Sequence, residues 1–205
     1  MNDLTRYLAV RDQIRAGDLI VFQGSGAVSG LIEAFSAGPS HAGIIRVIDR
    51  DAAGAKVVKM VESTIEGDRN GVQTNRLSER LANYDAGGRS WWLPLTDDIR
   101  RAIDWFQFYR FIGAAEDHVR YDKGALFEFI LRGFPIIGPR IAQAEHRNRM
   151  VCSGFVTAVL EAAGVLRGIN CSKVSPQDLI EMKLYRQCVQ LLGKPAALRN
   201  FNSLE

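Results

Sequence analysis

The sequence predicts an α+β fold in which helices pack on an antiparallel sheet. Strand-like apolar segments crowd into the first 95 residues, and helical periodicity takes over from Thr96. A polar turn, DRDAAG at 49–54, lies between two of the strand segments, as in an antiparallel hairpin. Strands that come first, with helices mostly after them, are typical of the α+β class.

The first part of the chain supplies a short helix and the strands. A helical spacing of apolar residues predicts an amphipathic helix over 2–14. We expect residues 23–40 to be a Gly- and Ser-rich connection around a short helical piece, and RLSERLAN at 76–83 predicts a second helix. Apolar runs predict strands at 17–22, 41–48, 56–63 and 90–95, with GVQTN at 71–75 as a short addition.

The later part of the chain is predicted to be helical. Thr96 caps a helix whose first turn carries Asp97 and Asp98, because a capping hydroxyl and early acidic residues both favour a helix start. Ser175 followed by Pro176 is a second start signal. We therefore expect helices from Thr96 onward, near 121–132, at 150–163 and at 176–185.

Composition indicates a single globular domain over 1–205, with its core at about 15–185. Hydrophobic residues make up 47% of the chain and charged residues 24%, which is near the average for globular proteins. The net charge of +3 is too small to predict a nucleic-acid partner. The densest basic stretch, 140–149, is better interpreted as a solvated face.

No apolar run approaches the ~20 residues that span a bilayer. Charges at Asp3, Arg6 and Arg11 interrupt any signal-peptide core, so we expect a chain made in the cytoplasm without a signal peptide. Three cysteines, an odd number without a CxxC pair, argue against a disulfide framework or a thiolate zinc site. They are Cys152, Cys171 and Cys188.

His41 and Glu62 form the first candidate pair. The turn at 49–54 centres near position 51.5, so a hairpin about it pairs residues whose numbers sum to about 103, as 41 and 62 do. Directly opposed residues share a face of the sheet, with Cβ atoms about 5 Å apart. Glu62 also shares a face with the apolar Val58 and Met60, and a buried acid needs a partner. The alternative is a solvated Glu62 at a strand end, with His41 capping a strand.

Cys152 lies where a helix is predicted to begin, in VCSGFVTAVLEAAG at 151–164. The helix dipole and the free N–H groups at this end favour a thiolate, the nucleophilic form of cysteine, and are suited to hold an oxyanion. The alternative is a small buried hydrophobe, which is the interpretation we favour for the other two cysteines. Cys152, His41 and Glu62 would form a nucleophile, its base and the group that orients the base.

Two further patterns are weak. GSGAVSG at 24–30 follows a strand, but it departs from the G-x-G-x-x-G spacing of a dinucleotide loop and lacks the Gly-Lys-Ser/Thr of a phosphate loop. His118 and His146 show neither an HxxxH nor a paired-carboxylate spacing. We therefore predict no cofactor and no metal ion.

RAGDLIVF, SHAGIIRVI, VVKMVES, GVQTNRLSERL, VRYDKGALFEF, MVCSGFVTAVLEAAG and VSPQDLIEM occur in this order. The series resembles the circularly permuted NlpC-type papain-like cysteine hydrolases, particularly their YiiX-like branch, over roughly residues 15–183. The resemblance implies a permuted papain-like fold and a catalytic triad of Cys152, His41 and Glu62. It also implies that Tyr121 lines the substrate or oxyanion site.

The resemblance implies a cysteine amidase or peptidase that acts through a thioester on bacterial cell-wall peptides, such as one with a γ-D-glutamyl–diaminopimelate bond. A chain made in the bacterial cytoplasm without a signal peptide would reach that substrate as an antibacterial effector of a type VI secretion apparatus or as a phage lysis protein. An immunity protein and the secretion machinery would then be its partners.

Two other functions fit the same residues. One is a lipid thioesterase or acyltransferase, similar to the lecithin:retinol acyltransferase group, with an acyl channel lined by the apolar stretch at 127–137. The other is a papain-like binding module in which Cys152 is unreactive. Labelling of Cys152 by an acyl donor would distinguish the first from the second.

Overall fold

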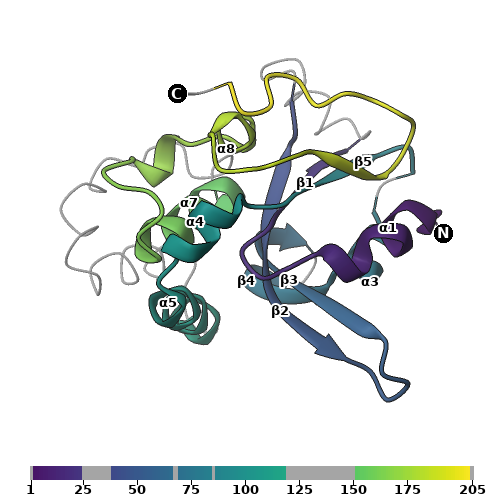
Figure 1. Ribbon diagram of the computed structural model, residues 1–205, viewed down its shortest axis with the longest axis horizontal. Coiled ribbons are helices and arrows are strands. Elements are labelled where there is room, and N and C mark those ends of the chain that lie inside the picture. Colours follow the sequence, from purple (N-terminus) through teal and green to yellow (C-terminus); the bar gives the residue numbers. More distant parts are fainter. Residues whose placement is uncertain (1, 25–37, 67–68, 85, 119–150, 204–205) are drawn as a thin grey trace.

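A six-stranded antiparallel sheet, in the order β4-β3-β2-β1-β5-β6, organises the chain (Figure 1). The computed structural model describes residues 2–24, 38–66, 69–84, 86–118 and 151–203. The strands are β1 Leu19–Gln23, β2 His41–Arg50, β3 Lys56–Glu66, β4 Arg69–Arg76, β5 Arg89–Leu93 and β6 Val189–Leu192. The predicted antiparallel sheet accompanied by helices is confirmed.

Helices lie on both sides of the sheet (Figure 1). They are α1 Thr5–Val10, followed by the 3-10 turn Arg11–Gln13, α3 Leu77–Ala82, α4 Asp97–Ala102, α5 Trp105–His118, α7 Val151–Ala162 and α8 Pro176–Glu181, with a 3-10 turn at Cys171–Lys173. In the segments that the structure describes, none of these helices is both long and apolar enough to cross a lipid bilayer.

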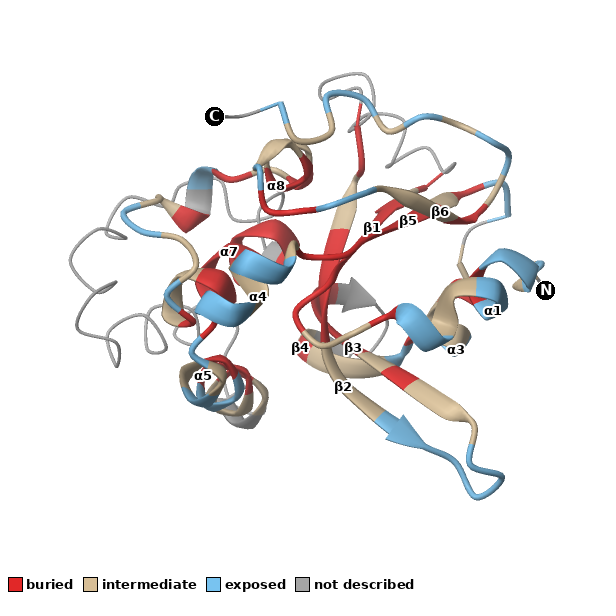
Figure 2. Ribbon diagram, viewed as in Figure 1, coloured by how far each residue is buried: buried red, intermediate tan, exposed pale blue. Residues whose placement is uncertain are grey.

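Alternating strand side chains build two separate cores. On one face, Leu19, Ala42 and Val61 pack with α5 and α7; on the other, Phe22 and Met60 pack with α1 and α3. Burial is most continuous along β1 and α7 (Figure 2). α7 packs against β2 and β3, at buried residues such as Ala42, Ile44 and Val61.

Local start signals are confirmed, whereas some element ends differ. The Thr96 hydroxyl accepts a hydrogen bond from the N–H of Ile99 at 3.3 Å. Ser175 and Asp178 form a reciprocal capping box at the start of α8. That helix ends at Glu181, earlier than predicted, and β6 was not predicted at all. The helix expected near 121–132 lies outside the described residues.

The hairpin of β2 and β3 turns later than predicted, at 51–55. The Asp51 carboxylate accepts hydrogen bonds from the N–H groups of Ala53 and Ala55, at 3.0 and 2.8 Å, and Gly54 adopts a φ of +79°. Asp49 and Arg50, which were assigned to the turn, pair with β3 instead. Pairs near the turn have residue numbers that sum to 106, so the predicted sum of about 103 is wrong.

A β-bulge then changes the register of this hairpin. Ile45 pairs with Met60 and Val47 with Lys59, so Arg46 is an extra residue in β2. On the far side of the bulge, at Ile44 and Ile45, the paired numbers sum to 105.

Asp18 anchors the strand next to β2. Its fully buried carboxylate accepts hydrogen bonds from the Trp92 indole at 2.8 Å and from the N–H groups of Arg15 and Leu95 at 2.8 and 3.1 Å. It also forms an ion pair with Arg100. Asp18 thus ties β1 to β5 and α4, and it contributes to structure rather than to the candidate site.

Candidate active site

His41 and Glu62 are in contact. The Nε2 atom of His41, the first residue of β2, lies 2.5 Å from Oε2 of Glu62 in β3. If paired residue numbers continue to sum to 105 toward the start of β2, Gly43 lies opposite Glu62. His41 is then the diagonal neighbour of Glu62 on the same face of the sheet, and not the directly opposed residue. The predicted contact is confirmed, but its predicted register is wrong by two residues.

The Glu62 carboxylate is fully buried and each of its oxygens is bonded. Asn75 Nδ2 donates to Oε1 at 2.8 Å, and Arg80 Nε lies 3.0 Å from Oε1 and 3.3 Å from Oε2. Burial by itself would raise the pKa of Glu62, but the hydrogen bonds and the charges of His41 and Arg80 lower it to about 2. Glu62 is therefore ionised over the whole physiological range.

Arg80 is itself held by aromatic rings. Its guanidinium carbon lies 5.3 Å from the ring centroid of Phe22 and 5.4 Å from that of Tyr84, in cation–π range. The Phe22 ring also lies 5.9 Å from the His41 ring. Sequence reasoning missed Arg80 and Asn75. The sequence indicated that a buried Glu62 needs hydrogen-bond donors. Which side chains supply them could be decided only once the pairing of the strands was known.

Cys152 lies in the first turn of α7, and its thiol contacts the His41 imidazole and the backbone N–H groups of Ala42 and Ser153. Burial would raise the pKa of this thiol, but the His41 charge and these hydrogen bonds outweigh burial and lower it. Burial would likewise lower the pKa of His41, yet the charges of Cys152 and Glu62 raise it to about 10. A lowered pKa of the Cys152 thiol and a raised pKa of His41 both favour the ion pair of a thiolate with an imidazolium.

The His41 ring has two partners. Nε2 is bonded to Glu62, and the imidazole is also hydrogen-bonded to the Cys152 thiol, from which we infer that Nδ1 is the nitrogen that faces the sulfur. A carboxylate on one nitrogen fixes the orientation of the ring and stabilises its charged form. Cys152, His41 and Glu62 thus form a continuous relay, brought together from α7, β2 and β3.

The other two cysteines have the opposite environment. Burial, together with a hydrogen bond from Cys171 to Glu161 at 3.3 Å, raises the pKa of the Cys171 thiol to about 12. Burial raises the pKa of the Cys188 thiol to about 11. Of the three cysteines, Cys152 alone has a lowered pKa.

Several predicted residues cannot be compared with the site. Tyr121, His146, the basic stretch at 140–149 and the apolar stretch at 127–137 lie outside the described residues. His118 ends α5, but its side chain also falls outside the description. Within the described segments, no group of three or more His, Cys, Asp or Glu side chains is arranged to hold a metal ion.

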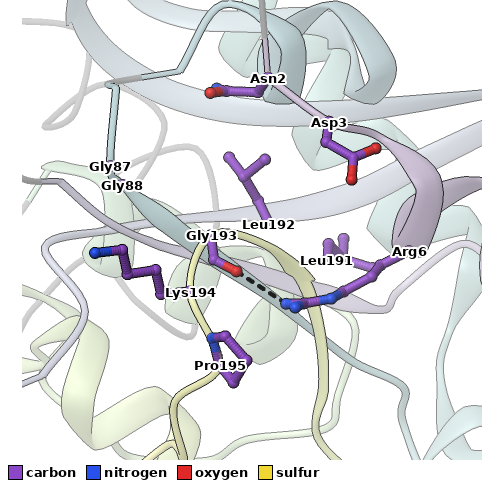
Figure 3. A pocket seen from close by; sticks show the side chains of 10 residues that line it. All are labelled: Asn2, Asp3, Arg6, Gly87, Gly88, Leu191, Leu192, Gly193, Lys194 and Pro195. Atoms are coloured by element: carbon purple, nitrogen blue, oxygen red, sulfur yellow. Dashed lines mark hydrogen bonds between the residues drawn. The ribbon is translucent and has the colours of Figure 1, made fainter.

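A separate hollow of about 360 Å³ lies where α1 meets the ends of β5 and β6 (Figure 3). Arg6 crosses it and donates to the carbonyl of Gly193 at 2.9 Å. Its lining residues are Asn2, Asp3, Arg6, Gly87, Gly88, Leu191, Leu192, Gly193, Lys194 and Pro195. It includes none of the Cys152 relay, so it is not part of the candidate active site.

The chain matches no protein-family model, and it matches no curated protein sequence.

Proposed function

We propose that this protein is a cysteine hydrolase, an amidase or peptidase, with Cys152 as nucleophile. One observation carries the proposal: the only thiol with a lowered pKa sits at a helix start against a histidine whose other nitrogen is held by a buried carboxylate. A thiolate beside an imidazolium is the activated form that cysteine hydrolases use.

The mechanism follows from these contacts. The Cys152 thiolate attacks a substrate carbonyl, and the resulting oxyanion is stabilised by N–H groups at the start of α7, including that of Cys152. The His41 imidazolium gives its proton to the leaving amine, which leaves a thioester on Cys152. His41 then takes a proton from water, the hydroxide attacks the thioester, and the acid product leaves. Glu62 keeps Nδ1 directed at the sulfur throughout.

The substrate class and the fold family are part of the same proposal. The order of motifs supports a permuted papain-like hydrolase, in which the histidine and the acid precede the cysteine along the chain. That resemblance favours a bacterial cell-wall peptide as substrate. Lipid acyl transfer would need an apolar channel, and the stretch at 127–137 that is predicted to line it lies outside the described residues; the experiment below distinguishes the two substrates.

The test is to trap the acyl-enzyme. Purified protein is incubated with cell-wall peptides and, separately, with acyl phospholipids, then quenched in acid and analysed by mass spectrometry. We expect an acyl adduct on Cys152 from the peptides, with product formation abolished in Cys152→Ala and kept in Cys171→Ala. An adduct from phospholipid alone would favour the lipid alternative. Wild-type turnover by Cys152→Ala would contradict the proposal.

The cell-wall substrate has its own test in bacteria. Protein directed to the periplasm should be toxic, the same protein kept in the cytoplasm should not be, and Cys152→Ala should be harmless in both places. The reason is that the cell wall is reached only from the periplasmic side. Equal toxicity in both compartments would contradict this substrate class.

A further inference from the structure

The turn at 51–55 by itself would put His41 and Glu62 on opposite faces of the sheet. A regular hairpin continued from that turn would keep the paired sum at 106, which opposes Glu62 to Ile44. Ile44 packs in the core beneath α7, whereas His41 lies with the Phe22 ring on the other face. A shift of one residue moves every side chain of a strand to the other face. The turn alone therefore does not build the site.

Arg46 changes this outcome because it is the extra residue of the β-bulge. At this point two residues of β2 lie opposite one residue of β3, so the sum of paired residue numbers changes from 106 to 105. With an odd sum, Glu62 turns to the face of His41, where the two side chains meet at 2.5 Å.

The core packing records the same shift independently. Ile45 and Ile48 both pack in the cluster that contains Met60 and Val58. They are three residues apart, whereas residues on one face of a regular strand are separated by an even number. The apolar packing on the two sides of Arg46 thus shows the same one-residue shift as the strand pairing.

Arg46 is held by residues from two other elements. Its guanidinium forms an ion pair with Glu116 of α5 and donates to Thr74 Oγ1 of β4 at 3.1 Å. Thr74 Oγ1 donates in turn to Glu116 at 2.6 Å, which closes a triangle of polar contacts. The side chains of Arg46 and Glu116 are 29% and 22% exposed, so water screens them less than a surface pair.

We infer that Arg46 is a positioning residue for the candidate active site. Held by Glu116 and Thr74, it keeps the bulge in place and so keeps Glu62 against His41. The effect of Arg46 on catalysis rests on the proposed function. Its effect on the contact between His41 and Glu62 is independent of that function.

The test compares Arg46→Ala and Glu116→Gln with the wild type by two measurements. One is the NMR resonance of the His41 proton shared with Glu62, which reports that hydrogen bond directly. The other is the rate of Cys152 alkylation near neutral pH. We expect the resonance to broaden or move upfield in both variants. We also expect alkylation to slow about tenfold, which is the effect of a rise of one unit in the pKa of the Cys152 thiol when the Glu62 contact no longer stabilises charged His41. Arg46→Lys should restore much of both signals.

Asp49→Asn is the matched control, since it breaks the exposed ion pair of Asp49 and Lys59 in the same hairpin on the turn side of the bulge. It should leave both signals unchanged. Folded Arg46→Ala and Glu116→Gln with an unaltered resonance would overturn the inference. A wild-type protein that shows the resonance, but whose Cys152 is inert, would contradict the proposed function and leave the positioning role standing.

Discussion

Replacing His41 with alanine should slow alkylation of Cys152 about a hundredfold near pH 6.5, because a thiol with a pKa of about 8.5 is only about 1% ionised there. In the wild type the His41 imidazolium keeps the sulfur charged even though burial opposes it. As pH falls from 9, the wild-type rate should therefore stay high well below the ordinary thiol range. In His41→Ala the alkylation rate should fall over the same pH range as that of an ordinary thiol.

Mass spectrometry of native protein would measure this rate separately for each cysteine. Cys171 and Cys188 are internal controls, since burial raises the pKa of their thiols to about 12 and about 11. Both should remain slow up to alkaline pH in wild type and variant alike. If wild-type Cys152 is as slow as Cys171 at every pH, the ion pair is absent and the binding-module interpretation gains support.

Replacing Arg80 with methionine should lower the free energy of unfolding by about 3 kcal/mol, because removing one partner of a buried ion pair leaves a buried charge poorly compensated. The Arg80 side chain is only 12% exposed and Glu62 is fully buried. His41 and Asn75 still bond to Glu62 in this variant, which places the loss at the lower end of the range for such changes. Urea denaturation would measure it.

Arg76→Met is the matched control for this prediction. Arg76 precedes the same helix and pairs with Glu79 at 3.4 Å, with both side chains more than half exposed. Such surface pairs contribute less than about 1 kcal/mol. Adding Glu62→Gln to Arg80→Met should cost less than the sum of the two single changes, because the buried charge is then gone. Equal losses in Arg80→Met and Arg76→Met would contradict the role of Arg80.

The dependence of the unfolding free energy on pH, in the acid range, should also change in Arg80→Met. The pKa of Glu62 is lowered to about 2 in the folded protein, so its ionised form stabilises the fold above about pH 4.5 and this contribution is lost as pH falls toward 2. Without Arg80 the folded-state pKa rises, and less stability remains to be lost. Unfolding free energies measured between pH 2 and pH 6 should therefore vary less in Arg80→Met than in the wild type.

Local sequence predicted the starts of α4, α7 and α8 and the three side chains that meet in the candidate site. Thr96 and Ser175 cap their helices through atoms only three residues away, so no tertiary contact is needed to recognise them. The position of Cys152 at a helix start can likewise be predicted from the apolar pattern that follows it in the chain. His41 and Glu62 were paired correctly, but on a register that was wrong by two residues, an even error that preserves the face.

Only the tertiary structure decided the register and what surrounds Glu62. Arg46, the extra residue of the bulge, contacts Thr74 and Glu116, which lie 28 and 70 residues away in the chain, and no local pattern encodes such contacts. Arg80 likewise reaches Glu62 because β4 and α3 pack beside β3. The sequence by itself thus predicted which side chains meet in the candidate site, whereas long-range packing decided how they meet, because strand pairing is set by contacts between distant segments.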